Sequence, residues 1–320
     1  MMKKYNLAVI SIIVSSFLTG CFVSSSRNQV ADLKGKTLDP AKVPTYLEGD
    51  RITYIDGKKE RVTKTEDGKV FWKRSKVRNW VADADFILPR EKYQSRRKQS
   101  EEVVTRKEGE IWPLRIGNET TFYSTKSVNN HEPFFYKESN RKWQCQVDGV
   151  SEINSLIGAY ETYRIECRKF NADNYKSSGT QKYWFYSPEL EHYLFAIEYK
   201  SSKSRSPLKE TEILSIQRGM KWLSSKEKKS LYKARRRAME NTNTGDHKKW
   251  VSKDKKTIVK IYPSKKLTMD NGVLCRNYKE VIKHDDIQQV AAGLLCRESK
   301  NKWKQPYNLA DDKNPILQLL

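Results

Sequence analysis

Short stretches of β-branched and aromatic residues, separated by turn residues, recur along most of the chain. The first three are divided by Asp56-Gly57 and Asp67-Gly68, pairs that are typical of tight hairpin turns. We therefore expect a three-stranded meander from Arg51 onward. Later stretches with the composition of strands are 111–114, 120–123, 143–147, 160–170, 182–186, 192–199 and 211–217. Strands at this spacing predict one antiparallel sheet, curved or rolled into a barrel around an aromatic core.

A helix is predicted after this sheet, because Ser224 and Glu227 have the spacing of a capping box. It is expected to reach Asn241 and to end at the Asn-Thr-Gly of 243–245. Its apolar residues form only a thin stripe, made of Leu231, Ala234, Ala238 and Met239. The basic residues around them are Lys228, Lys229, Lys233, Arg235, Arg236 and Arg237. The helix is either a solvated connector between domains or a docking surface for a polyanion.

Residues 246–305 predict a second, smaller β-domain. The stretch 258–262 is typical of a strand, and Asp285-Asp286 can form the whole turn of a following hairpin. In that register Tyr278 lies across from Gly293, where an aromatic ring can cover a strand glycine.

The cysteines predict two disulfides. Apart from Cys21, the chain has Cys145, Cys167, Cys275 and Cys296, with no Cys-x-x-Cys or nearby His pair that would indicate a metal site. The hairpin register places Cys275 directly opposite Cys296 as a non-hydrogen-bonded pair, which is close enough for a bridge. The remaining two cysteines lie in neighbouring predicted strands. We therefore expect Cys145–Cys167 and Cys275–Cys296.

The first twenty-one residues have the pattern of an export signal. Lys3 and Lys4 precede an apolar stretch at 7–18, which ends in Leu18-Thr19-Gly20-Cys21. This pattern resembles a bacterial lipoprotein signal, which implies cleavage before Cys21 and attachment of fatty-acyl lipid to it. Phe22 occupies the position where such lipoproteins carry Asp for retention in the inner membrane, so an outer-membrane anchor is favoured, on either face. An ordinary secretory signal with an incidental cysteine is the alternative.

The sequence thus predicts a mainly β protein with a curved or barrel-like N-terminal domain, a basic linker helix and a small disulfide-stapled C-terminal β-domain. Residues 22–45 have little apolar periodicity and several Ser and Pro residues, which favours a flexible tether. The expected parts are a signal peptide (1–20), a tether after lipidated Cys21 (21–45), an antiparallel β-domain (46–223), a helix and linker (224–245), a second β-domain (246–305) and a tail (306–320).

The net positive charge of the chain indicates which kinds of partner it can bind. The chain has 62 Lys and Arg against 39 Asp and Glu, and removal of residues 1–20 loses two lysines and no acid, which leaves +21 of the net charge of +23. A field of this sign is typical of proteins with polyanionic partners. Because export separates the protein from nucleic acid, the expected partners are the outer membrane itself and an anionic envelope polymer, such as lipopolysaccharide, peptidoglycan or capsule.

Two segments of the chain resemble known families of bacterial proteins. Residues 271–278, with Ala292-Gly293, Leu295-Cys296-Arg297 and Trp303, resemble the C-terminal domain of the 17-kilodalton surface antigen family of outer-membrane lipoproteins. The glycine-rich apolar segment that commonly precedes this domain in the family is absent here, and the resemblance covers about 250–305. Residues 158–167 and 183–190, within 46–223, resemble uncharacterised extracytoplasmic β-domains of bacteria, which implies a fold and no activity.

Motifs of known enzymes were not found. Gly35-Lys36-Thr37 resembles the end of a phosphate-binding loop, but Val30 occupies the position that needs glycine. The sequence contains no Gly-x-Ser-x-Gly, and its histidines, His131, His192, His247 and His284, are far apart. We therefore expect no catalytic residues, no metal and no cofactor other than the lipid on Cys21.

Two functions remain. The first is a non-catalytic, surface-antigen-like module that binds an envelope polymer through the basic helix. The second is a periplasmic carrier of lipid or another small ligand, or an assembly factor, in which the sheet of 46–223 encloses a cavity. A cavity lined by Trp72, Trp184 and Phe195 would favour the carrier, and a filled core would favour the module.

The lipid anchor generates the first testable prediction. Cys21→Ser should release the protein from membranes without unfolding it, because the substitution removes the thiol that carries the lipid. Fractionation of salt-washed membranes, with intact-mass analysis, checks this. An unmodified Cys21 in protein recovered from membranes would contradict the prediction.

Overall fold

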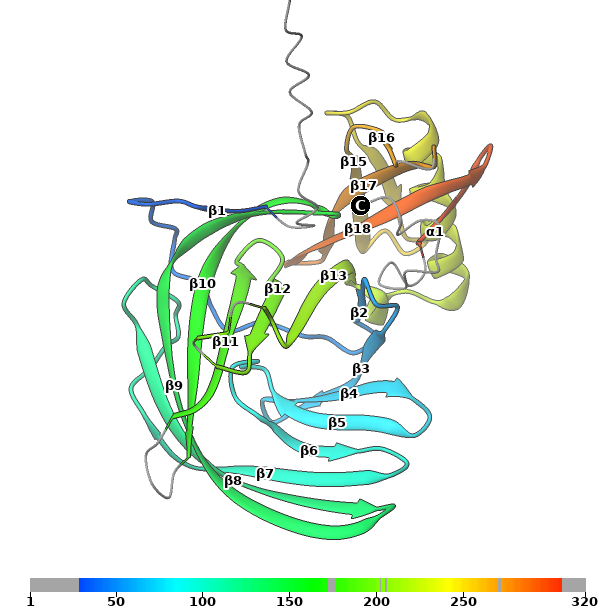
Figure 1. The fold of residues 1–320 in the computed structure, drawn as a ribbon. Coiled ribbons are helices and arrows are strands. Elements are labelled where there is room, and N and C mark those ends of the chain that lie inside the picture. The colour runs from blue at the N-terminus through cyan, green and yellow to red at the C-terminus, as the bar shows by residue number, and fades with distance from the viewer. Residues whose placement is uncertain (1–28, 172–176, 202, 205, 270–271, 307–320) are drawn as a thin grey trace, which may run out of the picture.

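The computed structural model describes residues 29–171, 177–201, 203–204, 206–269 and 272–306 (Figure 1). The expected signal peptide, Cys21 and almost all of the expected tail lie outside the described residues. Within them, no helix has the length and apolar character needed to cross a membrane.

Twelve antiparallel strands, β2 to β13, form a closed barrel, which confirms the predicted mainly β class (Figure 1). Each strand pairs with the next along the chain, and β13 pairs with β2 to close the circle. The strands are β2 (Arg51–Tyr54), β3 (Lys59–Glu66), β4 (Lys69–Ser75), β5 (Arg78–Asp83), β6 (Arg90–Gln94), β7 (Lys98–Glu108), β8 (Glu119–His131), β9 (Phe134–Ser155), β10 (Gly158–Asn171), β11 (Ser177–Ser187), β12 (His192–Tyr199) and β13 (Lys209–Gln217).

The predicted meander is confirmed as β2, β3 and β4. Asp67 and Gly68 both adopt a positive φ, 49° and 73°, at the turn between β3 and β4. This is the backbone conformation that a two-residue hairpin turn needs, and Asp and Gly adopt it more easily than most residues.

The interior of the barrel is partly filled by loop segments, because the ring of twelve strands is too wide for strand side chains alone to fill. Ala41 and Leu114 are both buried, and their backbone groups bond to each other at 2.7 and 3.2 Å. This pairing satisfies backbone groups that would otherwise be buried without partners. The predicted strand at 111–114 was therefore wrong: the segment lies in the barrel core and belongs to no strand of the sheet.

The predicted flexible tether at 21–45 was also wrong for the part that the structure describes, 29–45. Strand β1 (Gln29–Asp32) pairs with β9, and the Tyr163 hydroxyl donates to the backbone carbonyl of Leu38 at 2.8 Å. Pro40 and Pro44, which suggested flexibility, lie on either side of Ala41, which is buried in the barrel core.

The C-terminal part is a smaller sheet covered by helix α1 (Ser225–Asn241), which follows the short 3-10 helix η1 (Met220–Trp222). Its strands are β14 (Lys248–Val251), β15 (Thr257–Pro263), β16 (Leu267–Thr268), β17 (Leu274–His284), β18 (Ile287–Ser299) and β19 (Lys302–Lys304). The capping box at Ser224 and Glu227 and the apolar stripe of the helix are confirmed, with Leu231, Ala238 and Met239 buried against the sheet.

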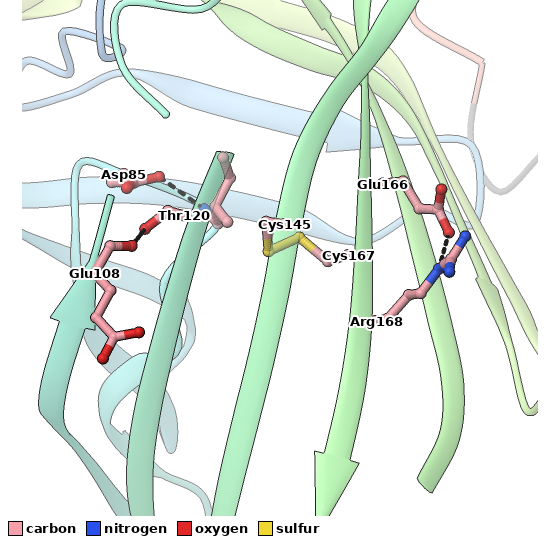
Figure 2. Close-up of a disulfide and its surroundings, with 8 residues drawn as sticks. Asp85, Glu108, Thr120, Cys145, Glu166, Cys167 and Arg168 are labelled. Carbon is pink, nitrogen blue, oxygen red and sulfur yellow. Dashed lines mark hydrogen bonds and ion pairs between the residues drawn. A yellow bond between two sulfur atoms is a disulfide. The ribbon is translucent and has the colours of Figure 1, made fainter. Parts of the chain in front are cut away.

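Both predicted disulfides are present. Cys145 and Cys167 join β9 to β10, and Cys275 and Cys296 join β17 to β18, with Cα separations of 4.1 and 4.0 Å. Figure 2 shows the first bridge on the opposite side of the sheet from Arg168, one residue after Cys167, as strand alternation requires.

The predicted register of the hairpin formed by β17 and β18 is also confirmed. This hairpin connects the C-terminal sheet to the barrel. Tyr278 lies opposite Gly293, and β18 pairs with β13 through Ser215 and Ile216. A Cβ atom on Gly293 would lie 2.8 Å from the Tyr278 hydroxyl and 2.9 Å from the Ser215 Cβ, so only glycine fits between them. The expected boundary near 223 is therefore a change of element within a shared core, because β17 and β18 contribute to the barrel's main apolar cluster.

The residues that carry the surface-antigen resemblance hold helix α1 on its sheet. Arg276 donates to the carbonyls of Met239 and Thr242 at the end of the helix, at 2.7 and 2.9 Å. Arg297 and the Trp303 indole both donate to Glu240, each at 2.6 Å. The two Cys-Arg pairs and the tryptophan thus perform a structural task.

Candidate functional site

The barrel contains a cavity of about 360 Å³, within the usual size range of small-ligand sites. Its aromatic lining comes from strands around the ring and from the loops inside it: Tyr46, Tyr54, Trp72, Trp80, Phe86, Phe122, Trp143, Trp184 and Tyr193. Trp72 and Trp184 line it, which is the condition stated above for the carrier. Phe195 does not line it. Its neighbour Ala196 belongs to the apolar cluster inside the barrel, so Phe195 points to the opposite face of β12, where it packs with Ile153 and Phe185.

Basic side chains gather on the same inner surface. Those that line the cavity are Arg90, Lys126, Arg141, Lys182 and Lys209, against Glu60, Asp83 and Glu102. Glu102 is buried and accepts from the Ser124 hydroxyl at 2.9 Å, from Lys126 at 2.8 Å and from Arg141 at 3.3 Å. This carboxylate therefore balances part of the charge of two of the cations.

Three of these cations face the cavity without an ion pair. In the described part of the chain, no carboxylate oxygen lies within 4.0 Å of the charged nitrogens of Arg90, Lys182 or Lys209. Arg90 and Lys182 instead lie over indole rings, 4.3 Å from the centroid of Trp80 and 4.1 Å from that of Trp184. A cation over an aromatic face is stabilised but keeps its capacity to bind an anion.

Burial lowers the pKa of Lys182 to about 8, and the nearby charges of Lys209 and Arg90 act in the same direction, while Glu198 opposes them. Its protonated form is therefore less stable than that of a lysine in water. A bound anion would stabilise the protonated form.

A buried histidine offers a further polar group to the cavity. His192 lies on β12, and its Nδ1 is 2.7 Å from the Tyr46 hydroxyl. Its Nε2 is buried and has no partner in the described structure, although the side chain lines the cavity. Burial, and then the charge of Arg218, lower the pKa of His192 well below its ordinary value, so the ring is neutral at pH 7. A neutral imidazole with one free ring nitrogen can hydrogen-bond a ligand.

Arg218 holds this corner of the barrel in place. Its guanidinium is fully buried, pairs with Asp50 at 2.7 Å and donates to the carbonyls of Thr45, Leu190 and Glu191 at 2.8, 3.1 and 3.2 Å. These contacts fix the loop before β12, and so they fix His192.

The six predicted polyanion-binding residues differ in their exposure to solvent. Lys228, Lys229, Lys233 and Arg237 are exposed on α1, and Arg236 is half-buried over the Tyr232 ring. Arg235 was wrongly included: it is 5% exposed and donates to both carboxylate oxygens of Glu280, at 2.6 and 2.8 Å. It occupies the buried face because it is four residues after Leu231 and three before Ala238.

A hollow of about 500 Å³ lies beside this helix, between α1 and the barrel. Exposed basic residues line it, namely Arg51, Arg61, Lys221 and Lys228, and Glu48 is the one acid among its described lining residues. The basic surface of the helix therefore continues onto the barrel.

The cavity cations were missed from the sequence, although a signal for them exists. Lys182 and Trp184 are two residues apart on β11, so they point to the same face, and Lys182 lies opposite the disulfide residue Cys167. Cys167 would have marked that face as the interior. The described residues also contain no group of three or more His, Cys, Asp or Glu that could hold a metal ion. No family model, curated protein or solved structure matches this chain.

The buried histidine generates a prediction about pH. In the unfolded chain a histidine takes up a proton below about pH 6.5, whereas folded His192 resists protonation. Its contribution to stability is therefore complete above about pH 6.5 and is lost as the pH falls, with a slope of up to about 1.4 kcal/mol per pH unit. His192→Gln should flatten the fall in the free energy of unfolding between pH 6.5 and pH 5, as measured by urea denaturation. An unchanged slope would show that other groups cause the pH dependence.

Proposed function

We propose that this protein is a non-catalytic binding protein of the bacterial cell envelope, which holds a small amphipathic anion inside its barrel. The observation that carries the proposal is the cavity, which combines aromatic walls with cations that have no ion-pair partner. Of the two functions that the sequence leaves open, this one matches the carrier.

The lining indicates the chemistry of the ligand. Indole and phenyl rings favour an apolar or aromatic body, because they bury large areas and offer flat faces. Lys182, Lys209 and Arg90 favour one acidic group, such as a carboxylate, sulfonate or phosphate. The free Nε2 of His192 can bond a further polar atom.

The proposed location is the outer membrane, through lipid on Cys21. Strand β1 begins at Gln29, so at most about 28 Å of extended chain separates the lipidated residue from the folded barrel. Such a short link would keep the barrel near the surface of its own membrane. The similarity of 250–305 to the 17-kilodalton surface antigen family supports the same location.

Binding of 1-anilinonaphthalene-8-sulfonate, an aromatic sulfonate, tests the cavity. We expect the dye to bind with enhanced fluorescence, and Lys182→Met to weaken binding about tenfold through loss of a charge-assisted contact. Binding to the wild-type protein should also weaken as the pH rises through about 8, because Lys182 then loses its proton. Lys229→Met, on the exposed helix, is the matched control. Equal affinities of the two variants would exclude Lys182 from the binding site.

A second candidate function is the binding of an anionic envelope polymer, and the hollow between α1 and the barrel favours it. Four exposed basic residues line it, and the lysines of α1 extend the same field. Here the protein would act as the surface-antigen-like module.

Charge reversal tests this second function. Arg61→Glu, Lys221→Glu and Lys228→Glu together should reduce retention on purified lipopolysaccharide or peptidoglycan, with a steep dependence on salt. The control reverses Lys265, Lys266 and Lys300, exposed lysines of the C-terminal part that do not line the hollow. Equal loss from both sets of residues would indicate diffuse charge, and no loss from either would leave the helix as a connector.

A further inference from the structure

One end of the barrel exposes aromatic side chains to solvent. At the turn between β8 and β9, Phe134, Phe135 and Tyr136 are 78%, 43% and 62% exposed. Successive residues of a strand point to opposite faces, so both faces of this hairpin carry exposed rings. Neither the cavity nor the apolar core explains these three residues, which follow one another directly.

Two neighbouring turns belong to the same surface. The backbone N–H of His131 donates to the carbonyl of Arg97 at 2.9 Å, which joins the β8–β9 turn to the β6–β7 turn. Strand β5 pairs with β6 through Asn79 and Gln94, which places the β4–β5 turn next in line. Figure 1 shows the three turns projecting from one side of the barrel. We call residues 76–78, 95–98 and 131–137 the rim.

The rim is strongly basic. It contains Lys76, Arg78, Arg96, Arg97, Lys98 and Lys137, and Glu132 is its one acid. Most of these side chains are exposed, and the ion pair of Arg97 with Glu132 is long, at 3.9 Å. Val77, 55% exposed, adds a further apolar side chain at the β4–β5 turn.

We propose that the rim docks on an anionic lipid bilayer. Aromatic rings are favourable at the boundary between head groups and acyl chains, and nearby Lys and Arg side chains are attracted to anionic head groups. A polymer of sugars and acids would use the basic residues but would leave Phe134 and Phe135 in water. The rim therefore matches a bilayer in both charge and polarity.

The rim lies far from the N-terminal strand. Strand β1 pairs with residues 151–154, near the end of β9, whereas the exposed rings lie at the start of that long strand. This placement separates the docking surface from the proposed anchor at Cys21. The inference does not depend on the cavity, although a carrier with such a rim could meet a membrane where it takes up or releases its ligand.

Vesicle sedimentation with the full chain carrying Cys21→Ser tests the proposal, because that substitution removes the anchor. We expect binding to phosphatidylcholine vesicles that contain about one-third phosphatidylglycerol, and little binding without the anionic lipid. Phe134→Ser, Phe135→Ser and Tyr136→Ser together should lower the affinity at least about tenfold. Leu208→Ser, which changes another exposed apolar residue, should leave it unchanged.

Two further experiments test whether the rim is the surface that binds and whether a lipid bilayer is its partner. Arg96→Glu with Arg97→Glu should weaken binding, and salt should reduce what remains. A solvent-sensitive fluorophore on Phe135→Cys should shift to the blue when anionic vesicles are added, whereas the same label on Leu208→Cys should not. Equal sedimentation of the triple variant and the Leu208→Ser control, or no shift at position 135, would overturn the proposal. Self-association without lipid that the triple variant abolishes would also overturn it, in favour of a second copy as the partner.

Discussion

The buried guanidinium of Arg218 holds the seam at which the barrel closes. It follows β13, the strand that pairs with β2, and it bonds to Asp50 just before β2 and to the loop before β12. Three segments that are far apart in sequence therefore meet around one cation. Removal of this side chain would leave the buried carboxylate of Asp50 without its counter-charge, and an unpaired buried charge is far more costly than a missing surface contact.

The width of the barrel explains why it has a cavity. A ring of eight strands can be filled by its own side chains, but twelve strands enclose more space. The chain fills part of that space with the segment before β2 and with the loop around Leu114. The remaining volume lies among aromatic and basic side chains, and this combination suits an amphipathic anion better than a purely apolar ligand.

The excess of positive charge serves different purposes in different places. Arg235, Arg218 and Arg276 are buried and satisfied by carboxylates or backbone carbonyls, so they stabilise the fold. Lys182 and its neighbours face the cavity, whereas the basic residues of the helix and the rim face solvent. The net charge is therefore a sum over structural, internal and surface groups, and it does not by itself identify one binding surface.

The sequence determined the features that depend on neighbours along the chain: the Asp-Gly turns, the helix with its capping box, and the register that joins Cys275 to Cys296. Turn geometry, capping and hairpin register are local, so a few adjacent residues specify them. Only the tertiary structure decided that 29–32 pairs with β9, that Ala41 and 111–114 enter the barrel core, that Arg235 pairs with Glu280, and that Phe195 points away from the cavity. The reason is that barrel closure and burial depend on strands and loops that are tens of residues or more apart along the chain, and their meeting leaves no periodic signal in either segment alone.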